Sequence, residues 1–139
     1  METRQFVSFI IGGHLLGLDI RQVREINRML DITPVQHARP HVRGLLNLRG
    51  QIVTVFDLGV RLGLGHLEIT PATHNVVLKG DDVALLVDAI GDAVEVPQSQ
   101  MDTPPANLGG IAAGLVREVV KLQDDLLVVL SVEKILDLD

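Results

Sequence analysis

The sequence is organised as short apolar segments that come in pairs, each pair joined by a tight turn of glycine or polar residues. Residues 5–11 (QFVSFII) and 14–20 (HLLGLDI) flank Gly12 and Gly13, and glycine tolerates the positive φ that a two-residue hairpin turn requires. Three further pairs have the same form, namely 44–48 with 51–58, 74–78 with 82–90, and 115–122 with 126–132. Short strands joined in this way, with no long helix between them, predict an all-β fold, either a sandwich or barrels.

Composition limits what such strands can bury and bind. The chain has 139 residues, 47% of them apolar, but only Phe6, Phe9 and Phe56 are aromatic, so the core is expected to consist of Leu, Val and Ile. This length predicts one domain over residues 1–139. The net charge of −6 repels a phosphate backbone, and there is no aromatic platform for stacking bases. Nucleic acid is therefore not an expected partner.

The sequence also bears on the compartment. It contains no cysteine, which excludes disulfides and thiolate chemistry and suits a reducing environment. Its start, METRQFVSF, lacks the basic and apolar regions of a signal peptide. The longest unbroken apolar runs, VALLV and LLVVL, are far shorter than the roughly 20 residues of a membrane helix. We expect a soluble cytoplasmic protein that does not insert into the membrane.

Three segments are expected to form short helices. Residues 20–30 (IRQVREINRML) place apolar side chains at helical spacing over part of their length. Residues 58–63 (LGVRLG) follow Asp57, and residues 132–138 (VEKILDL) follow Ser131. Both Asp and Ser are favourable N-caps because their side chains accept hydrogen bonds from the first free backbone amides of a helix.

The chain also resembles itself. Residues 44–63 (GLLNLRGQIVTVFDLGVRLG) align with residues 114–136 (GLVREVVKLQDDLLVVLSVEKIL), which matches Gly44 to Gly114 and the cap Asp57 to Ser131. Upstream, Leu18 aligns with Leu85. Accidental alignment of two Leu- and Val-rich strands is the alternative, but the matched glycines and caps favour two related β modules within one domain.

No group of residues has the pattern of an active site. His37 and His41 have a metal-ligand spacing, but Pro40 argues against a helix there and no nearby carboxylate completes a site, so both are expected to be solvated loop residues. The serines lack a nucleophile-elbow context, and the glycine clusters do not have the spacing of a phosphate-binding loop. We expect no catalysis, no metal and no cofactor.

Arg49 occupies an unusual place, between two apolar segments in NLRGQ (47–51). Asn47 and Gly50 are turn formers, so Leu48 and Arg49 are expected to project from the end of a hairpin. With Leu45, Leu46 and Leu48 around it, Arg49 would be a polar anchor on an apolar rim, as in a protein interface. The alternative is an ordinary turn arginine, solvated or paired with a carboxylate.

Four segments together resemble a known family. Residues 42–64 (VRGLLNLRGQIVTVFDLGVRLGL) are similar to the signature segment of the CheW family, the coupling proteins of bacterial chemosensory systems. Residues 6–26 are similar to its opening hairpin and the Val-x-Glu-Ile segment after it, and residues 76–96 and 114–136 to its later strands and closing helix. Thr54 stands where the family usually has Pro, and Leu15-Leu16-Gly17 replaces a frequent aromatic position.

The resemblance implies two small SH3-like five-stranded β-barrels packed together, with a few short helices and no enzymatic activity. It also implies two partners, the cytoplasmic tip of methyl-accepting chemoreceptors and the regulatory domain of the histidine kinase CheA, and recruitment to membrane-associated receptor arrays. The kinase-binding surfaces would be apolar barrel ends, with no residues assigned. The receptor-binding groove of the family corresponds here to Val23, Glu25, Ile26, Gly44, Leu46, Asn47 and Arg49.

Two other functions remain open at this point. One is a CheW-like paralogue that serves a non-flagellar chemosensory or motility pathway. The other is a regulatory module that binds a small ligand between its barrels through the His-rich loop VQHARPHVRG (35–44). An apolar groove with one Arg and one Glu suits a receptor helix better than a polar metabolite.

Overall fold

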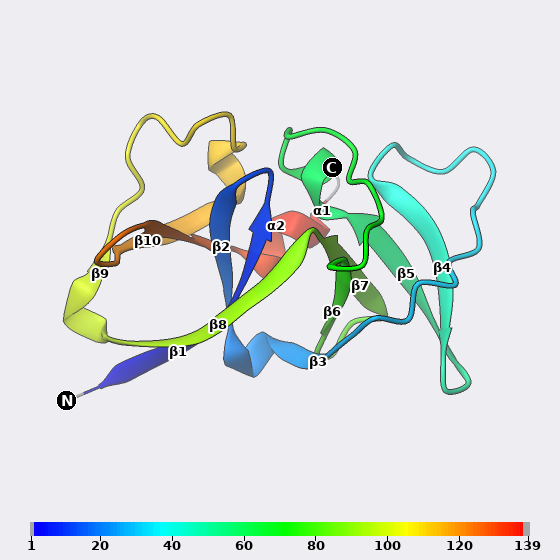
Figure 1. Cartoon of the computed structure of the whole chain (residues 1–139), viewed down its shortest axis with the longest axis horizontal. Coiled ribbons are helices and arrows are strands. Elements are labelled where there is room, and N and C mark those ends of the chain that lie inside the picture. The colour runs from blue at the N-terminus through cyan, green and yellow to red at the C-terminus, as the bar shows by residue number, and fades with distance from the viewer. Residues whose placement is uncertain (1, 138–139) are drawn as a thin grey trace.

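The structure, a computed structural model, describes residues 2–137 and consists of two β-sheets with five short helical segments (Figure 1). The strands are β1 (Thr3–Ile11), β2 (His14–Asp19), β3 (Val23–Asn27), β4 (Val42–Leu48), β5 (Gln51–Asp57), β6 (His74–Leu78), β7 (Val83–Val87), β8 (Ala89–Pro97), β9 (Met101–Asp102), β10 (Val116–Lys121) and β11 (Leu126–Leu130). The helical segments are α1 (Leu58–Arg61), α2 (Val132–Leu136) and three 3₁₀ turns, η1 (Ile20–Gln22), η2 (Gln98–Gln100) and η3 (Ala113–Leu115). No helix within residues 2–137 has the length and apolarity needed to cross a membrane.

All four hairpins expected from the sequence are confirmed as antiparallel pairs: β1–β2, β4–β5, β6–β7 and β10–β11. In the first hairpin Ile11 pairs with His14, and the two residues of the turn between them, Gly12 and Gly13, have φ values of +56° and +82°. Two consecutive positive φ values match the right-handed twist of the flanking strands, which explains why glycine occupies both positions.

The two sheets have the same internal order. The first runs β8-β1-β2-β11-β10-β9 and the second β3-β6-β7-β5-β4. In the first sheet β2 of the β1–β2 hairpin pairs in parallel with β11, the second strand of the β10–β11 hairpin. In the second sheet β7 of the β6–β7 hairpin pairs in parallel with β5, the second strand of the β4–β5 hairpin. The chain enters the second sheet at β3, after the first of these hairpins, and returns to the first sheet at β8, after the second. The first sheet has six strands rather than the expected five, because the two-residue β9 extends it beyond β10.

The proposed internal repeat matches this topology in its hairpins and helix caps, but the match of Gly44 to Gly114 was wrong, because Gly44 lies in β4 and Gly114 in η3. Helix α1 follows β5 and α2 follows β11, and both expected caps are confirmed. Asp57 Oδ1 accepts a hydrogen bond from the Val60 amide at 3.2 Å, and Ser131 Oγ accepts one from the Lys134 amide at 3.2 Å. Helix α2 ends at Leu136, so it is shorter than expected; residue 138, the end of the predicted helix, lies outside the described residues.

The helix expected over residues 20–30 is wrong. Only η1 is helical, with Asp19 as its cap, and the chain then extends as β3 along β6. The β-branched residues Val23 and Ile26 pair with Leu78 and Val76, and a bulge lies between Val23 and Glu25. Tertiary pairing with an available strand edge outweighs a weak local preference for helix.

Apolar side chains form two cores of unequal size. The smaller lies within the first sheet and consists of Phe6, Val96, Val120, Leu127 and Val129. The larger takes side chains from both sheets and so joins them. Strand β11 contributes alternate residues to each core: Leu127 and Val129 to the smaller, Val128 and Leu130 to the larger. Both faces of β11 are therefore buried.

Candidate partner-binding site

The turn that carries Arg49 is a two-residue hairpin turn in which both residues are left-handed. Arg49 has φ +53° and Gly50 has φ +90°, between the paired residues Leu48 and Gln51. Asn47 supports the turn, because its Oδ1 accepts a hydrogen bond from the Gly50 amide at 2.9 Å. The Arg49 side chain is 60% exposed. The turn chemistry expected from the sequence is confirmed, and it presents the guanidinium to solvent.

The apolar rim expected around Arg49 is different from the one the structure shows. Leu46 and Leu48 point inward and are only 2% and 1% exposed, because they alternate with Leu45 and Asn47 along β4. Leu48 therefore does not project from the hairpin, and that expectation was wrong. The exposed apolar residue beside Asn47 is its cross-strand partner Ile52, which is 52% exposed.

Glu25 on β3 pairs with Arg49, so the carboxylate partner that the sequence left open for this arginine is present. Arg49 Nη2 donates to Glu25 Oε2, and Asn27 Nδ2 donates to Glu25 Oε1 at 3.0 Å. These two hydrogen bonds, with that to Arg49 the stronger cause, hold the pKa of Glu25 below its ordinary value. Next to this pair, Arg24 Nη1 donates to Gln51 Oε1 at 2.7 Å.

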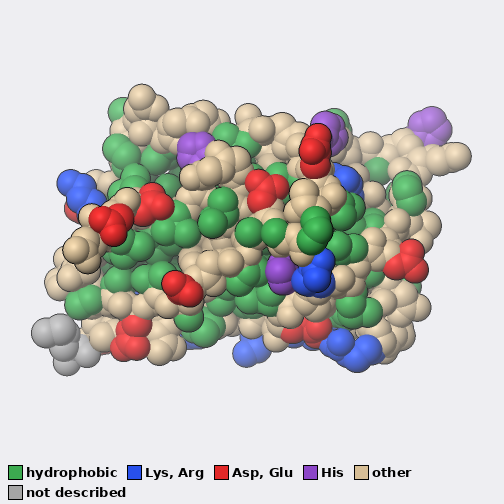
Figure 2. Space-filling view, viewed as in Figure 1, with side chains coloured by type: hydrophobic (Ala, Val, Ile, Leu, Met, Phe, Trp, Pro, Cys, Tyr) green, Lys and Arg blue, Asp and Glu red, His purple; other side chains and the backbone are tan. Residues whose placement is uncertain are grey.

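These side-chain contacts join opposite edges of the second sheet. Strands β3 and β4 are at the two ends of its strand order, and the contacts from Glu25 and Arg24 reach the tip of the β4–β5 hairpin. In Figure 1 the hairpin tip extends downward at the right, on the same side as β3, and Figure 2 shows acidic and basic side chains along this lower edge. All seven of the expected site residues lie on the two segments that meet here, β3 and the β4–β5 hairpin.

Ile26 and Val23 differ in exposure. Ile26 is 37% exposed on the strand that carries Glu25, whereas Val23 is half-buried and packs against the larger core. The exposed apolar side chains on β3 and the β4–β5 hairpin are Ile26, Leu45 and Ile52. Leu46 belongs to the larger core, and Val23 packs against it.

Gly44 shapes the edge of β4. A Cβ at this position would lie 2.2 Å from the carbonyl oxygen of Thr33, and the φ of Gly44 is +149°. The close approach lets Thr33 exchange two backbone hydrogen bonds of 2.8 Å with Leu45. Gly44 therefore permits the segment after β3 to lie against β4, which is a structural reason for a glycine at a position that the resemblance placed in a groove.

A buried ion pair next to the hairpin was missed by the sequence interpretation. Asp57 is fully buried, and besides capping α1 its carboxylate accepts hydrogen bonds from Arg43 Nη1 and the Leu67 amide, each at 3.0 Å. Arg43 Nη1 also donates to the Leu67 carbonyl at 2.8 Å. The pair thus attaches the loop after α1 to β4. The sequence did contain a signal for it. Asp57 stands at the end of a buried strand, where a carboxylate that caps a helix can also accept hydrogen bonds from other groups.

The two loop histidines have different environments. His37 is exposed, as expected, but His41 is buried against the Phe56 ring with centroids 4.8 Å apart, so its expected solvation was wrong. Burial, followed by the charges of Arg61 and Arg39, lowers the pKa of His41. Its carbonyl accepts a hydrogen bond from the Asp57 amide, which holds the residue inward. Residues 2–137 contain no cluster of His, Asp and Glu with metal-ligand geometry.

Comparisons with known proteins agree with this fold. The CheW-like domain family matches residues 5–139. The chain is 30% identical to the chemotaxis protein CheW of Treponema pallidum, with 96% of this chain and 82% of the relative aligned. It is 28% identical to the chemotaxis protein CheW of Thermotoga maritima, with 99% and 90% aligned. The crystal structure of the scaffolding protein TtCheW from Thermoanaerobacter tengcongensis shares the fold, with a TM-score of 0.90, 24% identity, and 99% and 95% of the two chains covered.

The family match covers nearly the whole chain, and the two curated relatives align along most of their own length. The chain therefore belongs to the CheW-like family. Its architecture of two small SH3-like β-barrels, one per sheet, is the fold that the family resemblance implied.

Proposed function

We propose that this protein is a non-enzymatic scaffold that couples the cytoplasmic tips of methyl-accepting chemoreceptors to the regulatory domain of the histidine kinase CheA. Its family membership and the names of its relatives, which are chemotaxis proteins and a scaffolding protein, support this function. In this role the protein is recruited to membrane-associated receptor arrays through its partners.

The single observation that carries the proposal is the meeting of β3 and the β4–β5 hairpin at the Glu25–Arg49 pair. The pair is polar and partly exposed, and the same strands and hairpin carry the exposed apolar residues Ile26, Leu45 and Ile52. An amphipathic receptor helix can place apolar side chains on this rim while its polar groups meet Glu25, Asn47 and Arg49. In this proposal Val23, Gly44 and Leu46 shape the site from within, and the kinase binds elsewhere, at the barrel ends.

Arg49 can bind a receptor helix while it stays paired with Glu25. In the free protein its guanidinium is paired with Glu25, and both side chains are partly exposed. A guanidinium has five N–H donors, so a receptor helix can accept hydrogen bonds from Arg49 without breaking its bond to Glu25. Loss of Arg49 should therefore remove receptor contacts and also leave the Glu25 carboxylate without its strongest partner.

The test compares receptor and kinase affinities of Arg49→Ala. Truncating a central interface arginine costs about 2 kcal/mol or more, which is a roughly thirty-fold loss of affinity. We expect that loss for binding to receptor-containing membranes, measured by co-sedimentation. Affinity for the isolated kinase regulatory domain, measured by titration, should stay within about threefold of the unmodified protein, since that is the scale of a surface substitution. Glu25→Lys should act in the same direction, and Arg49→Lys should restore receptor binding poorly, because an ammonium does not reproduce the fork of donors.

The internal repeat offers a matched control. Lys121 is an exposed cation at the end of β10, next to the corresponding turn of the first sheet. Lys121→Ala should leave receptor binding unchanged. If Arg49→Ala weakens kinase and receptor binding equally, or weakens neither, the assignment of this edge to the receptor is wrong.

A further inference from the structure

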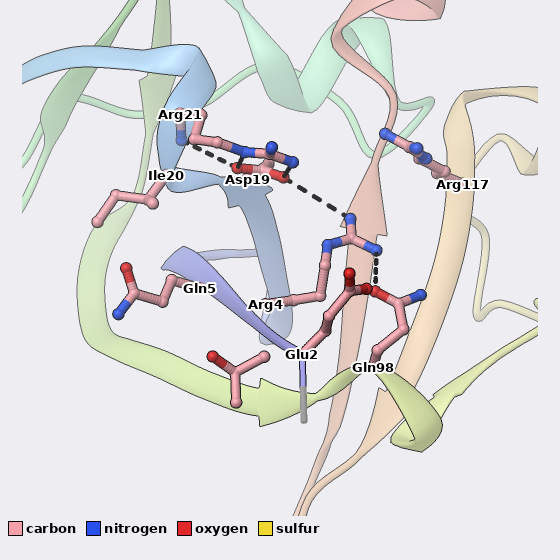
Figure 3. Close-up of a pocket in the computed structure, with 9 residues that line it drawn as sticks. Glu2, Arg4, Gln5, Asp19, Ile20, Arg21, Gln98 and Arg117 are labelled. Carbon is pink, nitrogen blue, oxygen red and sulfur yellow. Dashed lines mark hydrogen bonds and ion pairs between the residues drawn. The ribbon is translucent and has the colours of Figure 1, made fainter.

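A polar pocket opens at one end of the first sheet, outside the site described above. It has a volume of about 600 Å³ and is lined by the start of β1, the end of β2, η1, η2 and β10 (Figure 3). Three arginines line it, Arg4, Arg21 and Arg117, each from a different element. This volume is in the range of about 300–1,000 Å³ typical of small-molecule sites. In a chain with a net charge of −6, a pocket with three guanidinium groups is a local exception.

Arg4 is the innermost of the three and has too few partners. Its side chain is only 13% exposed and lies over the Phe6 ring, 5.2 Å from the centroid. Nη1 makes two long hydrogen bonds, to Glu118 Oε1 at 3.3 Å and to Gln98 Oε1 at 3.4 Å. Nη2 is 3.7 Å from Asp19 Oδ2, beyond hydrogen-bond distance, and Nε is buried without a partner in the described structure. A buried guanidinium with unused donors favours an added acceptor.

The carboxylates near Arg4 are engaged with the other arginines. Asp19 accepts from Arg21 Nε at 3.1 Å and Nη2 at 2.8 Å, so the two side chains form a bidentate pair. Figure 3 shows Asp19 held between Arg21 and Arg4. The hydrogen bond from Arg21 is the main reason that the pKa of Asp19 is lowered. Glu118 is shared between Arg4 and Arg117, whose Nε lies 3.6 Å away.

Arg4, Asp19 and Glu118 are the most buried charges at the pocket, whereas Arg21 and Arg117 reach into solvent. Three guanidinium groups face the two carboxylates of Asp19 and Glu118. The lining itself contains two acids, Asp19 and Glu2, and Glu2 is exposed and forms no ion pair with the described residues. Arg117 is 56% exposed, so its guanidinium can turn toward a ligand without leaving a buried charge behind.

We propose that this pocket binds the phosphate group of a small phosphorylated molecule. The tetrahedral oxygens of a phosphate can accept hydrogen bonds from several directions at once, which suits arginines that approach from three elements. A carboxylate offers two oxygens in one plane and would serve one guanidinium well. No aromatic residue lines the pocket, so recognition rests on the phosphate and not on stacking against a base. The proposal is independent of the receptor-binding function, because it concerns the other sheet.

The experiment is a calorimetric titration of the full chain with inorganic pyrophosphate, at constant ionic strength so that screening does not change. We expect saturable binding to one site. Arg117→Gln should weaken that binding about tenfold or more, the scale of one lost charge-assisted hydrogen bond. The matched control is Arg28→Gln, since Arg28 is an exposed arginine outside the pocket lining; this variant should bind pyrophosphate as the unmodified protein does.

Three results would overturn the proposal. The first is heat that never saturates, which would mean that water satisfies Arg4. The second is an equal loss in Arg117→Gln and Arg28→Gln, which would mean diffuse attraction to basic residues. The third is acetate binding as tightly as pyrophosphate, which would assign the pocket to carboxylates. Arg117 is chosen for the variant because it is exposed, whereas removal of Arg4 would also disturb the fold.

Discussion

The two sheets have the same strand order but complete their edges in different ways. In the first sheet the edge strands β8 and β9 are joined directly by the three-residue turn η2, and the sheet encloses its own small apolar core. In the second sheet the edge strands β3 and β4 are separated by residues 28–41 and meet through side chains, above all Glu25 and Arg49. In the first sheet the chain itself connects the two edge strands. In the second sheet exposed polar side chains connect them, and these side chains can also contact another protein.

This difference predicts that the two repeats respond differently to the same substitution. Val128 and Thr54 occupy the same place in the topology but have different surroundings, whereas Gly44 and Gly114, which the sequence alignment pairs, lie on different elements, β4 and η3. Paired substitutions in the two sheets therefore show which stability losses are common to both repeats and which depend on the contacts of one sheet.

The largest effect is expected at Val128, which is 4% exposed on the strand that supplies both cores. Val128→Asp would bury a carboxylate without a partner, at a cost of several kcal/mol, and should abolish the cooperative thermal transition. Its counterpart Thr54 is half-buried, so Thr54→Asp should retain a folded protein. Circular dichroism melts of the two variants make the comparison. A cooperatively melting Val128→Asp protein would show that β11 is less enclosed than described.

The next effect concerns the Arg43–Asp57 pair, which has no equivalent at Ser131. Arg43→Ala leaves the carboxylate of Asp57, 1% exposed, without its charged partner, and removal of one member of a buried pair costs about 3–5 kcal/mol. Ser131→Ala removes only a helix cap and should cost about 1 kcal/mol. Urea denaturation measures both values. Equal losses from the two variants would mean that Asp57 acts as a cap and little more.

Gly44 and Gly114 should respond differently to the same added methyl group. Gly44→Ala places a Cβ against the Thr33 carbonyl at a φ of +149°, and such backbone strain costs of order 1–3 kcal/mol. A Cβ at Gly114 would meet no atom within 4 Å, so Gly114→Ala should change the free energy of unfolding by less than about 0.5 kcal/mol. Thermal melts of the pair test whether the close approach of residues 32–33 is needed. An unaffected Gly44→Ala protein would argue that this segment can move away freely.

The smallest stability effect is expected for the Glu25–Arg49 closure itself. Both side chains are partly exposed, and ion pairs of this kind contribute about 0–1 kcal/mol, so Arg49→Ala should melt near the temperature of the unmodified protein. The pKa of Glu25 should rise toward its ordinary value when Arg49 is removed, which an NMR pH titration would detect. The pKa of Glu25 is lower in the folded protein than in the unfolded chain. Its small contribution to the free energy of unfolding is therefore present above the unfolded pKa and is lost as the pH falls through the folded pKa. A Glu25 pKa that does not change in Arg49→Ala would contradict the ion pair.

Local patterns determined most of the secondary structure. The four hairpins, the two capped helices and the Arg49 turn follow from short-range chemistry: glycine at positive φ, polar caps, and apolar residues in short runs. The same patterns indicated the internal repeat and, with the family resemblance, the segments that meet at the candidate site. These features were predictable because the atoms that cause them are neighbours along the chain.

Tertiary structure decided the features that depend on residues far apart in sequence. Residues 23–27 became an edge strand because β6 offered a partner, and the inward direction of Leu46 and Leu48 depends on which face of β4 the core covers. His41 is buried and Asp57 is paired for the same kind of reason, since Phe56, Arg43 and Leu67 reach them only in the folded chain. The sequence by itself determined that residue 49 is a turn arginine. Only the fold brought Glu25 to it, because opposite edges of the second sheet meet when that sheet curls.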